Sequence, residues 1–257
     1  MDNHDRGLAY DLKTLLNRRR ALFLLGGASL TALAACSSAE TTATATTTTV
    51  KACTDKIPEE TAGPYPGDGS NGPDILTTSG IVRGDIRSSF GSASAVAQGI
   101  PLTIKLNLQK DCAAYAGAAI YLWHCDMDGK YSMYSQGVTT ENYLRGVQEA
   151  DANGAVTFQS IFPAAYSGRW PHIHFEVYPD LAQATSAGTK SVTSQLALPE
   201  DVCKTVYATS GYETSVRNMS QTSLARDMVF RDGTEHQLAT VTGDVNSGYT
   251  ATLTVAV

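Results

Sequence analysis

The sequence has little positive charge, no Cys-x-x-Cys pair and few apolar patterns of helical period. Its 19 lysines and arginines are outnumbered by 25 aspartates and glutamates, which gives a net charge of −6 at pH 7. This balance argues against binding nucleic acid and against electrostatic attachment to anionic lipid. The missing cysteine pair argues against a cysteine metal site. Scarce helical periodicity together with 22 glycines indicates a turn-rich, mostly β protein.

The first 35 residues have the pattern of an export signal. Arginines at 18–20 precede the apolar run 21–25, and a stretch of small residues ends at Leu33-Ala-Ala-Cys36. A positive region, an apolar run and a small-residue cleavage site describe such a signal, and the paired arginines resemble a twin-arginine signal. The alternative is a membrane-spanning anchor, but an apolar stretch of about 15 residues is short for a span of about 20.

The segment that ends at Cys36 also resembles a bacterial lipobox, in which the cysteine is acylated and becomes the new N-terminus. We therefore predict a twin-arginine-like lipoprotein signal peptide at 1–35 and a Thr/Ala-rich tether at 36–56, too poor in large apolar residues to pack. The protein is expected to be exported and lipid-anchored on the outer face of the bacterial cytoplasmic membrane or in the periplasm. Residues 57–257 are then one domain.

Short strands separated by turns predict an all-β fold, a β-sandwich of short mixed strands with long loops and one short helix. Every second residue from Leu102 to Leu108 is apolar, so one face of this strand is buried. The continuous apolar run 118–125 predicts a strand covered on both sides. Further strands are expected at 155–161, 172–178, 191–198, 236–242 and 249–257, and the helix is expected at 199–209.

Four cysteines follow Cys36 in the chain. In an exported protein, Cys53, Cys112, Cys125 and Cys203 suggest two disulfides, for which three pairings are possible. Cys125 lies in an apolar strand and could equally be a buried free thiol.

The segment Tyr166-Ser-Gly-Arg-Trp-Pro-His-Ile-His174 carries the strongest chemical signal. Because side chains in a strand alternate between faces, His172 and His174 point the same way and can reach one metal ion. Two imidazoles alone fit zinc, copper or iron. Tyr166 and Tyr131, which follows the turn Asp126-Met-Asp-Gly129 and is expected to be exposed, add hard phenolate oxygens. Two histidines and two tyrosines together suggest ferric iron.

The order of motifs resembles that of the intradiol ring-cleavage dioxygenases, the protocatechuate and catechol dioxygenase-like family, here of an exported lipoprotein type. The resemblance runs from about Ile57 to the C-terminus and is densest over 121–178. Its motifs are Asp-x-x-Gly-x-Tyr131, Leu144-Arg-Gly-Val-Gln148, Asp151-Ala-Asn-Gly154, Phe158-Gln-Ser-Ile-Phe-Pro163 and the segment with both histidines, with Gly63-Pro-Tyr-Pro66 upstream and Thr193-Ser-Gln-Leu196 downstream.

The resemblance implies an enzyme that cleaves a catechol ring between its two hydroxylated carbons, with O2 and non-haem Fe(III), to a cis,cis-muconate type product. It implies iron ligation by two tyrosines and two histidines, with an axial tyrosine that leaves the metal when substrate binds. It also implies a catalytic arginine and glutamine and a tyrosine that binds substrate. Matched to this sequence, the metal ligands are Tyr131, Tyr166, His172 and His174, the catalytic residues are Arg169, Tyr166 and Gln195, and the substrate-binding residue is Tyr65.

The expected partners are a catechol-type aromatic substrate and O2, with the membrane contacted only through the anchor at Cys36, in a monomer or homo-oligomer. One alternative is a non-catalytic β-sandwich lipoprotein that binds aromatic or carbohydrate ligands. Another is a zinc hydrolase, for which Glu176 is the one nearby general base. Three further side chains are expected in the core: His124 hydrogen-bonded, Arg145 paired with an acidic side chain, and Trp123 in apolar packing.

The lipoprotein prediction has a direct test in the N-terminus of the mature protein. Mass spectrometry of the protein extracted from membranes should find an acylated Cys36 as the first residue. A mature N-terminus at any other residue would contradict the prediction.

Overall fold

The computed structural model describes residues 54–186 and 188–257. The predicted signal peptide at 1–35, the anchor at Cys36 and most of the tether lie outside the described residues. Within those residues, no helix is long and apolar enough to cross a membrane.

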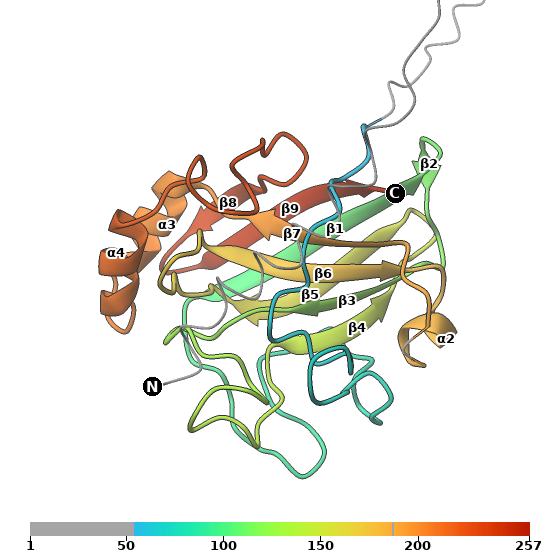
Figure 1. The fold of residues 1–257 in the computed structure, drawn as a ribbon, viewed down its shortest axis with the longest axis horizontal. Helices are drawn as coiled ribbons and strands as arrows, with labels where there is room; N and C mark the ends of the chain where they lie inside the picture. The colour runs from blue at the N-terminus through green and yellow to red at the C-terminus, as the bar shows by residue number, and fades with distance from the viewer. Residues whose placement is uncertain (1–53, 187) are drawn as a thin grey trace, which may run out of the picture.

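Two β-sheets enclose the main hydrophobic core of the described chain, which confirms the predicted sandwich (Figure 1). The first sheet has the order β2-β1-β9-β8, and β5 also pairs with β1; the second has the order β4-β3-β6-β7. The pairs of the second sheet are antiparallel, whereas β1 and β9 run parallel. The strands are β1 (Pro101–Lys110), β2 (Ala113–Ala114), β3 (Ala119–Trp123), β4 (Arg145–Glu149), β5 (Ala155–Ile161), β6 (His172–Tyr178), β7 (Val192–Ala197), β8 (Thr240–Asp244) and β9 (Gly248–Ala256).

Strand β1 follows the predicted alternation, since every second residue from Leu102 to Leu108 is buried. Strands β3 and β6 are buried along their whole length, because both faces of the second sheet are covered. Ile120, Ile173 and Phe175 belong to the core between the sheets. Tyr121 and Trp123 belong to a second buried cluster on the opposite face of β3.

The chain that precedes β1 covers this second face. Its first part, blue in Figure 1, passes in front of β7 and β6. Two backbone hydrogen bonds hold it there, from Ile57 N to Ala256 O at 2.9 Å and from Glu60 N to Thr193 O at 2.8 Å. The Gly63-Pro-Tyr-Pro66 motif is therefore brought over the face that carries both histidines of β6.

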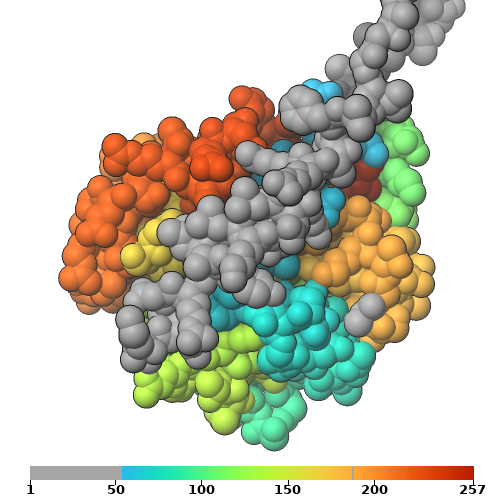
Figure 2. All heavy atoms as spheres, viewed as in Figure 1, coloured from blue at the N-terminus to red at the C-terminus, as the bar shows by residue number. Residues whose placement is uncertain are grey.

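Helix α3 (Glu200–Tyr207) confirms the predicted helix, with acidic Glu200 and Asp201 in its first turn, where they favour the helix dipole. Helices α2 (Leu181–Ala184) and α4 (Glu213–Ser220) were not predicted. The sequence of α4, ETSVRNMS, has few strong helix formers, so packing rather than propensity accounts for it. Helices α3 and α4, in orange, form one end of the molecule (Figure 2).

Two expectations are corrected by the structure. The strand expected at 236–242 begins only at Thr240, and half-buried His236 lies in a turn. Cys125 and Cys203 are buried and free, so the expectation of two disulfides is wrong. Cys112 is disulfide-bonded, and its pairing lies outside the described residues.

Candidate metal centre

The four predicted ligands come together on the covered face of the second sheet. His172 and His174 are each 2% exposed, and their Nε2 atoms lie 3.0 Å apart. The Tyr166 hydroxyl oxygen lies 3.1 Å from His172 Nε2. The Tyr131 ring centroid lies 5.9 Å from that of Tyr166 and 6.2 Å from that of His174. Nitrogen and oxygen donors of four side chains thus converge.

Tyr131 is buried rather than exposed, with 2% of its surface accessible. The turn that precedes it is formed as predicted: the Asp126 carboxylate accepts hydrogen bonds from Asp128 N and Lys130 N at 3.0 and 2.9 Å. The ring of Tyr65 then covers Tyr131 at a centroid distance of 5.1 Å. A turn in the sequence therefore did not indicate solvent exposure here, because a distant segment lies over it.

The protonation states suit metal ligands. His172 Nδ1 donates to Trp170 O, which leaves the lone pair on Nε2. Burial and neighbouring Arg169 hold the pKa of His172 well below its usual value, and burial and His172 lower the pKa of His174. Both imidazoles are therefore neutral. Burial and neighbouring Tyr166 raise the pKa of Tyr131.

The hydroxyl of Tyr131 is buried and has no hydrogen-bond partner within the described part of the chain. An unsatisfied buried polar atom costs about 1–3 kcal/mol, and a bound cation would remove that cost. No three His, Cys, Asp or Glu side chains among residues 54–186 and 188–257 are grouped to hold a metal. Anionic ligation at this centre would therefore have to come from tyrosine, and this donor set fits ferric iron.

A column of aromatic rings fixes the plane of the His174 imidazole. Trp123, its neighbour across the β3–β6 pair, stacks on it at 4.9 Å and 7°, and Tyr121 stacks on Trp123 at 4.9 Å and 21°. Gly63 lies so close above that a Cβ there would be 3.3 Å from His174 Cε1. Trp123, expected in apolar packing, thus packs directly against a candidate ligand.

Arg169 is held by a carboxylate that the sequence did not single out. Its Nε donates to Asp227 Oδ2 at 2.9 Å, and its Nη2 donates to Gln195 Oε1 at 2.6 Å. Asp227 is fully buried and also accepts from Trp170 N at 2.7 Å. Gln195 Nε2 donates to Thr61 O at 2.8 Å. Gln195 therefore acts on the site by fixing Arg169 and the covering segment.

Glu176 cannot serve as the general base of a zinc hydrolase. One carboxylate oxygen accepts from Lys190 Nζ at 2.6 Å and the other from the Tyr178 hydroxyl at 2.7 Å.

His124 is buried and hydrogen-bonded as expected, to Cys125 O and Ser160 Oγ, and burial lowers its pKa to about 4.

The expectation that Arg145 pairs with an acidic side chain is wrong. Its hydrogen bonds within the described chain go to carbonyl and hydroxyl oxygens, among them Tyr65 O, Pro66 O and Ser132 O. A basic residue beside an apolar run does not by itself reveal whether its partners are charged.

Solved structures show that the chain has the fold of intradiol ring-cleavage dioxygenases. Such a dioxygenase from Tetranychus urticae is 24% identical, with a TM-score of 0.56, over 68% of this chain and 86% of that one. Another solved dioxygenase, also 24% identical, has a TM-score of 0.62 over 80% of this chain and 94% of the other. The resemblance predicted from the sequence is thus confirmed at the level of the fold.

Among curated proteins, a chlorocatechol 1,2-dioxygenase of Pseudomonas sp. (strain P51) is similar to part of the chain. The two are 34% identical over 99 residues, which cover 31% of this chain and 39% of that enzyme. No protein-family model matches the chain.

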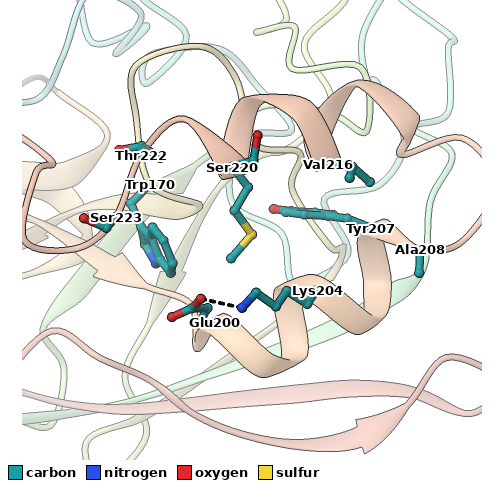
Figure 3. Close-up of a pocket in the computed structure, with 10 residues that line it drawn as sticks. Trp170, Glu200, Lys204, Tyr207, Ala208, Val216, Ser220, Thr222 and Ser223 are labelled. Carbon is teal, nitrogen blue, oxygen red and sulfur yellow. Dashed lines mark ion pairs between the residues drawn. The ribbon is translucent and has the colours of Figure 1, made fainter.

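A separate pocket of about 470 Å³ lies between α3 and α4 (Figure 3). Trp170, Tyr207 and Met219 are among its lining residues, and the Glu200–Lys204 ion pair of 2.6 Å lies on its wall. None of the four candidate ligands lines this pocket. One of its lining residues, Trp170, directly follows Arg169 in the chain.

Replacing Asp227 should be costly because Arg169 would remain charged and buried. We expect Asp227→Asn to lower the free energy of unfolding by about 3 kcal/mol, the range for breaking one side of a buried ion pair. The matched control is Glu200→Gln, which breaks an exposed ion pair and should cost about 0.5 kcal/mol or less. Urea unfolding of both variants measures the difference. Equal losses of unfolding free energy would show that the buried Arg169–Asp227 pair is no stronger than the exposed Glu200–Lys204 pair.

Glu60 should make stability depend on pH. Burial, with Asp232 nearby, raises its pKa from 4.5 to about 7, against a hydrogen bond from Gln237 and the charge of Arg169, which lower it. The folded state then holds a proton that the unfolded chain loses, so this contribution to stability is complete below pH 4.5 and is lost as the pH rises to about 7.

Urea unfolding at pH 5 and pH 8 tests this sign. Between the two pH values, the free energy of unfolding of Glu60→Gln should fall by about 3 kcal/mol less than that of the unchanged protein. This figure follows from about 1.4 kcal/mol for each pKa unit. Exposed Glu59→Gln is the control and should behave like the unchanged protein. If the free energy of unfolding falls equally in Glu60→Gln and Glu59→Gln between pH 5 and pH 8, Glu60 does not titrate in this range.

Proposed function

We propose that this chain is an intradiol dioxygenase that cleaves a catechol between its two hydroxylated carbons, using O2 and non-haem Fe(III), with a cis,cis-muconate type product. The observation that carries the proposal is the convergence of two neutral imidazoles and two phenols beside a buried arginine. The shared fold and the partial likeness to a chlorocatechol 1,2-dioxygenase support it. Export and lipid anchoring at Cys36 remain predictions from the sequence.

In this proposal Tyr131, Tyr166, His172 and His174 would hold the iron. When bound, ferric iron would chelate the diol and make the ring carbon reactive towards dioxygen. The two neutral histidines leave the charge to be balanced by tyrosinate oxygens, so the centre needs no carboxylate.

Tyr166 is suited to exchange a proton with the substrate. It is the one candidate ligand that is half-buried, and exposed Ser167 and Gly168 follow it directly. Its phenolate oxygen would accept a proton from the incoming diol, and the ring could then move away towards solvent. Buried Tyr131 would keep its position, because Tyr65 and Tyr166 pack against it.

Arg169 supplies positive charge at the same place. Its guanidinium is oriented by Asp227 and Gln195 before substrate binds, so it would stabilise negative charge that develops on the ring at little reorganisation cost. Tyr65 is half-buried beside Tyr131 and Tyr134, and would form an aromatic wall for the substrate ring.

The visible absorption spectrum of the ferric-loaded, full-length protein tests the proposal. We expect a broad tyrosinate-to-iron band that shifts when catechol is added without oxygen, because the diol replaces ligands of the metal. Tyr131→Phe and Tyr166→Phe should each weaken or shift the band and lower catechol cleavage by at least about a hundredfold, the order of loss when a reacting geometry is broken.

The matched control is Tyr212→Phe. This variant also removes a buried tyrosine hydroxyl, which donates a hydrogen bond to Phe162 O at 2.8 Å. Neither Tyr212 nor Phe162 is a residue of the site. The control should keep the band and the activity. A colourless protein that still binds metal would discard the proposal in favour of a binding protein or a zinc enzyme.

A further inference from the structure

Arg145, the first residue of β4, is buried in a cage of uncharged groups. It donates five hydrogen bonds: Nη1 to Pro66 O at 2.8 Å and to Tyr121 Oη at 3.0 Å, Nη2 to Tyr65 O and to Ser132 O at 3.0 Å each, and Nε to Ser132 Oγ at 3.1 Å. Its Cζ also lies 5.4 Å from the ring centroid of Tyr134. All three nitrogens of the guanidinium thus donate hydrogen bonds.

No acidic oxygen within the described chain lies within 4.0 Å of this guanidinium, although only 1% of the residue is exposed. A buried charge without a counter-charge is expensive, and apolar replacements are often as stable. Arginine is nevertheless suited to this place, because its planar fork can satisfy several carbonyl oxygens at fixed angles. The role of Arg145 therefore lies in the backbone geometry that its hydrogen bonds fix.

Arg145 joins two segments that are far apart in the sequence and that both reach the metal centre. On one side it binds the carbonyls of Tyr65 and Pro66, in the segment that covers the site. On the other it binds the backbone and hydroxyl oxygens of Ser132, the residue that follows Tyr131. The rings of Tyr65 and Tyr131 then meet at a centroid distance of 5.1 Å.

The covering segment is shaped for this contact. Gly67 has a φ of +69°, and a Cβ there would lie 2.8 Å from Arg145 Nη1. The Tyr121 hydroxyl donates to Pro66 O at 2.7 Å, so the same carbonyl is held twice. A glycine of positive φ thus allows the backbone to pass directly over the guanidinium.

We propose that Arg145 is a positioning residue that sets the distance between the substrate wall at Tyr65 and the metal ligand Tyr131. This inference deepens the proposed function and rests on it for its catalytic consequence. The hydrogen bonds of Arg145 reach none of the four candidate ligands; it acts through the two segments that carry Tyr65 and Tyr131.

The matched control is Arg83, which also donates to carbonyl oxygens at the start of β4. Its Nε and Nη2 donate to Arg145 O at 2.9 and 2.7 Å, and Nη2 also donates to Asn142 O at 3.2 Å. None of its hydrogen bonds within the described chain goes to Tyr65, Pro66 or Ser132. Arg83→Met should therefore cost stability without changing the site.

The test compares full-length unchanged protein with Arg145→Lys, Arg145→Met and Arg83→Met. Lysine keeps the charge and folds most readily, but it lacks the fork. Both Arg145 variants should shift the visible band of the ferric protein and raise the KM for catechol roughly tenfold, the size expected for losing one charged hydrogen bond. Arg83→Met should lower the unfolding temperature while the band and KM stay as they are.

A metal-free readout separates this inference from the proposed function. In the protein without metal, hydrogen–deuterium exchange at residues 63–68 and 131–135 should be faster in Arg145→Lys and unchanged in Arg83→Met. If exchange, band and KM respond alike to both arginines, the positioning role is overturned. If the unchanged ferric protein shows no tyrosinate band, the proposed function fails, and the exchange data still decide whether Arg145 fixes the two segments.

Discussion

The alternation of side chains along β6 is the constraint on which the core and the candidate metal centre both depend. Ile173, Phe175 and Val177 point into the core between the sheets, while His172 and His174 lie on the opposite face. The strand is paired with β3 on one side and β7 on the other. A slip of one residue would bury both imidazoles in the apolar core. The hydrophobic effect therefore fixes the face of β6 on which both candidate ligands lie.

Buried Arg169 and half-buried Lys190 hold the segments that complete the site over this sheet. Arg169 binds Asp227, which lies beyond α4 in the sequence. Lys190 lies 2.6 Å from both Asp68, in the covering segment, and Glu176 in β6. Such contacts contribute little net stability once desolvation is counted, but they strongly favour one geometry. The sheet supplies rigidity, and these long-range polar contacts determine where the loops lie.

The sequence predicted those features that depend on local pattern. The period of two in 102–108, the continuous apolar run at 118–125 and the strand at 172–178 all correspond to strands of the structure. The shared face of His172 and His174 follows from the same period. Phenolate chemistry drew attention to Tyr131 and Tyr166, but no local rule places a loop beside a strand, so their position beside the histidines rested on the order of motifs.

Features that depend on distant segments could not be predicted. Strand β4 contains Arg145 and Gly146 and has only five residues, so its apolar period is too short to recognise. Asp227 stands in a loop, and its importance lies in a contact with a residue 58 positions away. Tyr131 was expected at the surface because the segment that buries it precedes it by more than sixty residues in the chain.

The balance of charge explains why the tyrosines, rather than the histidines, distinguish this centre. Neutral imidazoles suit several metals, among them zinc, copper, iron and nickel. Two buried carboxylates of the described chain, Glu176 and Asp227, already face Lys190 and Arg169. Anionic charge for a bound cation must then come from phenols, whose buried pKa values resist ionisation. Only an ion of high charge offsets that cost, so the surrounding salt bridges themselves favour a trivalent metal.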